Sequence, residues 1–183
     1  MSRRTLFTKL LHAALLLVVA HQLFLVALVE RPRGTSAGNA FYAWHETNGL
    51  LALGVVTAYW LWALARRSET AAGALFPWLS ARRRHAVWRD LRDRVERRFR
   101  LTHAEESALA SATHGLGLLT VSALAGTGAL MALGGVPGGP ALQIHKLLAN
   151  LMWAYVIAHA SIALLHQFQG HNVLQRMFGP TPG

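Results

Sequence analysis

Histidines are the residues whose type and spacing suggest chemistry in this chain, which has ten histidines and no cysteine. Seven lie within or at the edges of long apolar stretches: His12, His21, His45, His114, His145, His159 and His166. Ionisable side chains at membrane depth are costly and usually functional. Imidazoles bind metals, ligate haem iron and carry protons. Without cysteine, thiolate chemistry and iron–sulfur clusters are excluded.

Four apolar blocks must position these histidines, at roughly 5–29, 40–65, 107–133 and 141–168. Each exceeds the ~20 residues with which a helix crosses the ~30 Å hydrocarbon core. We therefore expect an all-α fold, an integral membrane four-helix bundle forming one domain over residues 1–183. A soluble bundle is disfavoured because the blocks lack a repeating polar face. The first block is too long for a signal peptide, so we expect it to be retained.

Basic residues predict the topology. Fifteen of the 18 lysines and arginines lie on one predicted side of the membrane: near the amino terminus, in the 66–106 loop and after the last block. The remaining three, Arg31, Arg33 and Lys146, lie on the opposite side. By the positive-inside rule, both termini and the 66–106 loop should be cytoplasmic. The net charge of +10 then reflects topology, and we do not expect a nucleic-acid partner.

The basic loop contains its own helical pattern over residues 81–101. Trp88, Leu91, Val95 and Phe99 recur at helical spacing, and arginines fill most other positions. This pattern predicts an amphipathic helix between the second and third spans, suited to an anionic lipid surface or to partner docking. The alternative is a solvated helix with Asp–Arg and Glu–Arg pairs.

The depths of the histidines form two levels. His45 and His145 lie near the outer ends of their blocks, whereas His12 and His159 lie nearer the inner ends. Since His145 and His159 are 14 residues apart, a helix places them on nearly the same face, about 21 Å apart along its axis. Each level thus has two imidazoles from two helices.

Two imidazoles at one depth suit the axial positions of a bis-histidine b-type haem in a four-helix bundle. Small residues lie one turn after three of these histidines, at Gly49, Ala149 and Ala163, where a flat ring needs space. A zinc site would need three or four clustered donors. No nucleophile–base pair, phosphate loop or dinucleotide fingerprint is present, so we predict no catalytic residue.

The remaining intramembrane histidines are expected to have other roles. His21 is half a turn out of phase with His12, so we interpret it as a hydrogen-bonding or interface residue. His114 is level with His12 and His159 and could bond a haem propionate, line a quinone pocket or support a ligand. His166 continues the stripe of His159 and is a candidate for a similar supporting or quinone-binding role.

The histidine order, with "LHAALLLV", "WHETNGLLALG", "IHKLLANLMWAYVIAHASIALLHQ" and "NVLQRMFGP", resembles the bacterial cytochrome b561 family. These di-haem membrane proteins are related to the cytochrome b subunits of nickel–iron hydrogenases and formate dehydrogenases. The resemblance implies two haems b, the outer held by His45 and His145 and the inner by His12 and His159. It also implies electron transfer between quinone and a redox partner at the bacterial inner membrane. The long basic loop departs from the compact loop of short members.

Three functions remain open at this point. The first is a stand-alone di-haem cytochrome linked to the quinone pool, and the second is a membrane-anchor cytochrome subunit of a larger dehydrogenase, hydrogenase or reductase. The third is a haem-free transporter or assembly factor that uses histidines for protons or metal. Membrane lipid and quinone are the expected partners, with a redox partner subunit or an oligomer possible. Copurification of a larger subunit separates the first two, and haem absorption separates both from the third.

Overall fold

The computed structural model describes residues 5–66, 72–96, 107–135, 138–170 and 172–179. Four long helices dominate these ranges: α1 (Leu6–Leu25), α2 (Ala40–Ala65), α5 (Ala108–Gly134) and α6 (Gly139–Phe168). Each is long and apolar enough to cross a membrane, with α1 extended to Leu28 by the short η1 (Val26–Leu28). This confirms the expected all-α fold with four candidate spans, whose bounds agree with the predicted blocks within a few residues.

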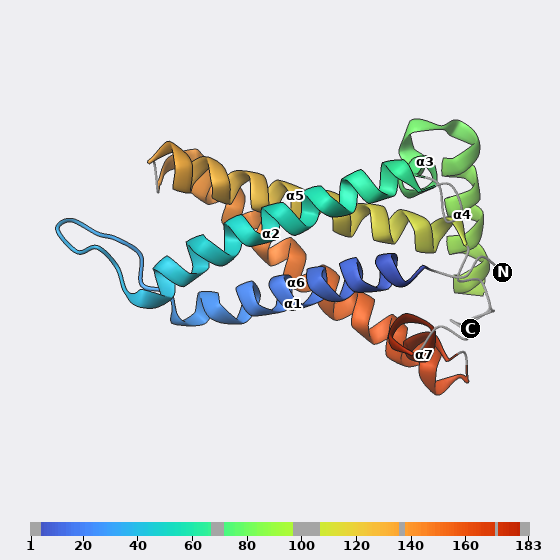
Figure 1. Cartoon of the computed structure of the whole chain (residues 1–183). Coiled ribbons are helices and arrows are strands. Elements are labelled where there is room, and N and C mark those ends of the chain that lie inside the picture. Colours follow the sequence, from blue (N-terminus) through green and yellow to red (C-terminus); the bar gives the residue numbers. More distant parts are fainter. Residues whose placement is uncertain (1–4, 67–71, 97–106, 136–137, 171, 180–183) are drawn as a thin grey trace.

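Short helices lie mainly between α2 and α5 and after α6. They are α3 (Ala72–Leu75), η2 (Pro77–Leu79), α4 (Ala81–Glu96) and α7 (Val173–Phe178). α3, α4 and α7 lie at the same end of the bundle as the start of α1 (Figure 1). We call this the α4 end, and the opposite end, with the 29–39 loop and the start of α6, the loop end. Lys9 Nζ donates to Gly179 O at 3.1 Å, joining the start of α1 to the chain after α7.

Side-chain caps set where three of the four spans begin. Thr5, Asn39 and Ser107 precede α1, α2 and α5, and their side-chain oxygens accept hydrogen bonds from backbone N–H groups of the first turn. Such caps satisfy donors that the helix itself leaves free. Asn39 also donates from Nδ2 to Leu28 O at 2.8 Å, which closes the loop between α1 and α2.

The packing of the spans is unequal. Extensive backbone contacts join α1 to α2, α2 to α5 and α5 to α6, whereas α6 has no comparable contact with α1 or α2 in the described chain. α6 crosses the bundle obliquely, as Figure 1 shows. Met152 is the one buried residue of α6, whose residues are all described. Side chains must therefore bridge the distance from α6 to α1 and to α2.

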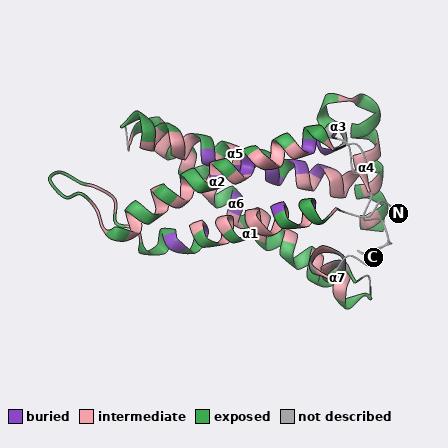
Figure 2. Cartoon of the chain, in the orientation of Figure 1, coloured by how far each residue is buried: buried purple, intermediate pink, exposed green. Residues whose placement is uncertain are grey.

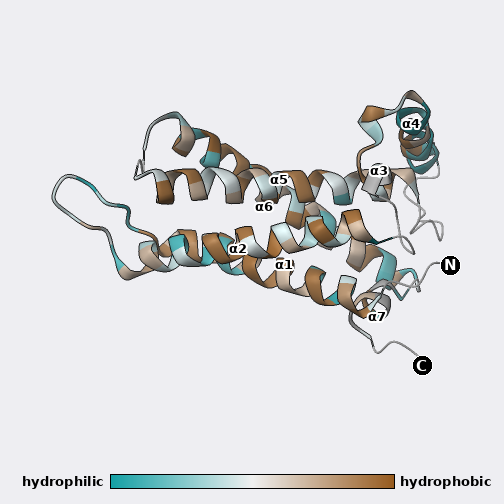
Figure 3. Ribbon diagram, turned by 45° about the horizontal axis from the view of Figure 1, so that its top comes forward, coloured by the Kyte–Doolittle hydropathy of each residue, from teal (hydrophilic) through white to brown (hydrophobic). Residues whose placement is uncertain are grey.

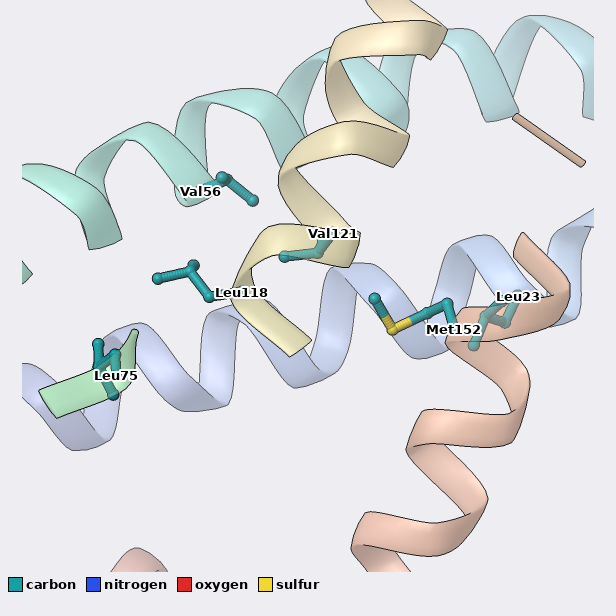
Figure 4. Close-up of a cluster of buried hydrophobic side chains, with 6 residues drawn as sticks. All are labelled: Leu23, Val56, Leu75, Leu118, Val121 and Met152. Atoms are coloured by element: carbon teal, nitrogen blue, oxygen red, sulfur yellow. The ribbon is translucent and has the colours of Figure 1, made fainter. Parts of the chain in front are cut away.

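A small apolar core holds the spans together. Its buried members come from α1, α2, α3, α5 and α6 and are shown in Figure 4: Leu23, Val56, Leu75, Leu118, Val121 and Met152. Most other apolar side chains on the spans are exposed or half-buried, and the outer surfaces of these helices are largely hydrophobic (Figures 2 and 3). Lipid, rather than protein, is the expected solvent of these surfaces.

Two tryptophans of α2 add polar links between spans. Trp62 Nε1 donates to Thr8 Oγ1 of α1 at 2.7 Å, and Trp60 Nε1 donates to Ser122 Oγ of α5 at 2.9 Å. Trp60 also stacks on Phe76, which follows α3, with ring centres 5.4 Å apart. Hydrogen bonds of this kind between membrane helices contribute about 1 kcal/mol each, so α2 is the central element of the bundle.

The contact between α3 and α5 generates a prediction about stability. A Cβ atom added at Gly115 of α5 would collide with the backbone carbonyl oxygen of Leu75 in α3. Gly115→Ala should therefore displace α3 and lower the free energy of unfolding by about 1–3 kcal/mol, as overpacking does. The measurement is the midpoint of thermal unfolding in detergent, followed by circular dichroism.

Gly54→Ala is the matched control, because Gly54 of α2 is exposed and a Cβ there meets nothing within 4 Å. It should leave the midpoint unchanged or slightly higher, since alanine is the better helix former. Equal midpoints for the two variants would contradict the close packing of α3 on α5.

Candidate functional site

The outer level of histidines lies in the second turns of two helices at the loop end. His45 of α2 and His145 of α6 face each other with ring centres 6.2 Å apart and ring planes at 88°. Both residues are partly buried. This contact crosses the gap between α2 and α6, whose backbones do not pack closely.

Thr127 of α5 contacts the ring of His145 through its Nδ1 atom. Its hydroxyl donates to Ala123 O at 2.8 Å, with Leu124 O at 3.0 Å, and its oxygen lies 2.9 Å from His145 Nδ1. A hydroxyl has one proton; when that proton points to the backbone, the Thr127 oxygen is free to accept a hydrogen bond from Nδ1–H of His145. The proton of a neutral His145 is then on Nδ1, and Nε2 keeps a lone pair for a ligand.

His45 is positioned through its backbone. Gln22 of α1 donates from Nε2 to His45 O at 2.8 Å, and a Cβ at Gly49 would lie 3.1 Å from the same Gln22 nitrogen. Gly49, predicted to leave space for a flat ring, thus also admits the Gln22 side chain. The buried Nδ1 of His45 has no hydrogen-bond partner among the described residues, so this ring can still orient toward an added group.

The inner level is nearer the α4 end and is surrounded by more polar rings. His12 of α1 and His159 of α6 have ring centres 6.5 Å apart, at 51°. His114 of α5 lies 5.4 Å from the His159 ring, and Tyr155 stacks on that ring at 5.4 Å and 10°. Gly117 of α5 makes room for Tyr155, because a Cβ there would overlap the phenol ring.

The spacing within both pairs fits two ligands of one iron. A metal–imidazole bond is about 2 Å long and a ring nitrogen lies about 1 Å from the ring centre, so two opposite axial imidazoles have centres about 6 Å apart. The observed values are 6.2 and 6.5 Å. No group of three or more metal-binding side chains occurs in the described ranges. A haem needs only two protein ligands, because the porphyrin supplies the other four.

Other residues predicted for the site are distributed as follows. His114 lies beside the inner pair, as its depth predicted. His21 is exposed on α1, and His166 is half-buried near the end of α6, two turns beyond His159. Sequence reasoning missed Thr127 and Tyr155. Tyr155 precedes His159 by one helical turn and could have been noted, whereas nothing in the sequence gives the register that brings Thr127 to His145.

Four apolar helices long enough to cross a membrane, with facing imidazoles at two depths, define a multi-pass membrane protein. The chain belongs to the prokaryotic cytochrome b561 family, whose family model matches residues 3–180. Comparison with curated proteins and with solved structures gives no match. Family membership makes the protein a b-type membrane cytochrome of electron transfer and confirms the resemblance seen in its sequence.

Proposed function

We propose that the protein binds two haems b and transfers electrons across the membrane between the quinone pool and a redox partner. His45 and His145 are the proposed axial ligands of the outer haem, and His12 and His159 those of the inner haem. The observation that carries this proposal is the ring spacing, 6.2 Å in one pair and 6.5 Å in the other. Two separate pairs, each with a spacing that would suit two ligands of one iron, support two sites rather than one.

Haem supplies a one-electron couple when bound, and the protein contributes position and environment. α6 provides one imidazole to each site, so its 14-residue interval holds the sites about 21 Å apart along the helix. In this proposal the Thr127 oxygen accepts a hydrogen bond from Nδ1–H of His145, which leaves Nε2 as the nitrogen that would bind iron. The apolar spans exclude water around both pairs.

The distribution of arginines supports an orientation of the protein in the membrane and the surfaces at which its partners would bind. The α4 end carries most of the arginines, so we assign this end to the cytoplasm and the loop end to the outside. A partner at the outer surface would then exchange electrons with the site of His45 and His145. A partner at the inner surface would exchange electrons with the site of His12 and His159. His114 and His166 are the proposed supporting or quinone-contacting residues on the inner side.

Single substitutions of the proposed ligands provide the first test. His45→Ala and His12→Ala should each reduce haem from two per chain to one, because each removes one axial ligand from a different site. The measurement combines a dithionite-reduced minus air-oxidised spectrum with haem counting by pyridine haemochrome. The double variant should retain no haem.

His21→Ala is the control, because His21 is a histidine in the same span as His12 but is exposed. It should retain two haems. A full haem complement in His45→Ala or in His12→Ala would refute that assignment. A folded wild-type preparation without haem would refute the cytochrome function in favour of transport or assembly.

Thr127 provides a second test, specific to the outer site. Thr127→Val keeps the side-chain shape but removes the acceptor for His145 Nδ1–H, whereas Thr127→Ser keeps the acceptor. Losing such a supporting bond typically weakens binding at the ligand by about 10–100-fold. We expect Thr127→Val to weaken retention of one haem about tenfold and raise its midpoint potential, since the imidazole becomes less basic.

The measurement is a redox titration with haem counting in both variants and in wild type. The second haem should keep its potential, and Thr127→Ser should resemble wild type. Identical potentials in Thr127→Val and wild type would show that this hydrogen bond does not tune the site.

A further inference from the structure

α4 presents three different faces along its 16 residues. One face is fixed to the protein: Asp90 Oδ2 accepts from Leu109 N at 3.3 Å, and Arg94 Nη2 donates to Ser107 Oγ at 3.3 Å. Ala86 and Val87 are half-buried near this side. These contacts attach α4 to the first turn of α5, and the Asp90 carboxylate suits the positive end of that helix.

The second face is apolar and exposed. Trp88, Leu91 and Val95 have exposed fractions of 68%, 37% and 56% and recur at one-turn spacing, so they form one stripe. We call these three residues the α4 stripe. Leu79, just before α4, is 84% exposed. This is a large apolar surface for a helix that is otherwise polar, as its colouring in Figure 3 shows, and such surfaces mark interaction sites.

The third face is charged and mainly basic. α4 contains six arginines against three acidic residues. Arg82, Arg89 and Arg92 are exposed. Arg92 makes an ion pair with Glu96 at 2.7 Å, which leaves the helix with an excess of positive charge. An apolar stripe beside Arg92, on a helix with an excess of exposed arginines, is complementary to an anionic lipid surface, where acyl chains meet negative headgroups.

The position of α4 also favours lipid. It lies in the connection between two membrane-spanning helices, α2 and α5, and its contacts with α5 hold it at the end of a span. In Figure 1 its ribbon runs across the end of the bundle, crosswise to the long helices. A helix held in this way lies along the membrane surface.

We propose that α4 lies in the headgroup region of an anionic leaflet, with the α4 stripe inserted among the lipids and its arginines bonded to phosphates. Lipid is favoured over a protein partner because the spans already place α4 beside the bilayer. The proposal is independent of haem. It predicts that anionic lipid shields the α4 stripe from water.

The absence of cysteine makes site-directed labelling a direct test in the full chain. Val95→Cys places a nitroxide on the α4 stripe, and Asp93→Cys places a matched label on the exposed charged face. Both variants are reconstituted in nanodiscs of phosphatidylcholine alone or with phosphatidylglycerol. In anionic discs, the Val95 label should collide severalfold less with a water-soluble nickel chelate, and more with oxygen, than the Asp93 label.

The additional variants Arg82→Gln and Arg89→Gln should return the Val95 label toward water, because they remove charge without touching the stripe. Equal chelate accessibility at Val95 and Asp93 in anionic discs would overturn the proposal. So would shielding of Val95 that is equal in discs of phosphatidylcholine alone, which would show that anionic headgroups do not hold the α4 stripe in the leaflet. Circular dichroism of each variant verifies that its helices are retained.

Discussion

A bilayer offers no water to backbone polar groups, so a helical span must form its backbone hydrogen bonds within itself, and the rest of this structure depends on that constraint. With hydrogen bonds made inside each helix, the spans meet one another only through side chains and close backbone packing. The protein core is therefore small, and α6 buries only Met152. Association rests on a few specific links instead: the Trp60 and Trp62 hydrogen bonds from α2, the Asn39 hydrogen bond to Leu28, and α3 packed against Gly115.

The two histidine pairs follow from the unequal packing of these spans. α6 runs along α5 but stays away from α1 and α2, so imidazoles reach across where backbones do not meet. At each pair, α5 contacts the imidazole that α6 contributes. At the outer pair this contact is made by the Thr127 hydroxyl, and at the inner pair by the His114 ring, both from α5. α5 is therefore the element that orients the rings of α6, although it contributes neither member of a pair.

Much of the fold could be predicted because lipid imposes simple length rules. The second predicted span, 40–65, agrees with α2 at both ends, and α6 begins two residues before its block. The two levels of histidines needed only helix geometry and depth. Contacts that depend on register between helices could not be predicted, which is why Thr127 and Gln22 were missed. The basic amphipathic helix was expected over residues 81–101; α4 is described to Glu96, and Phe99 lies outside the described residues.

The single helix shared by both pairs has a consequence for how the sequence can change. Substitutions on the lipid-facing side of α6 alter neither the angle nor the interval between its two histidines. Inserting or deleting one residue between His145 and His159 turns one ring by about 100° relative to the other, and only one pair can then remain aligned. Inserting or deleting about seven residues would restore the angle but would move the two pairs by about 10 Å relative to each other along the helix. This part of the gene should thus accept many replacements and almost no change in length.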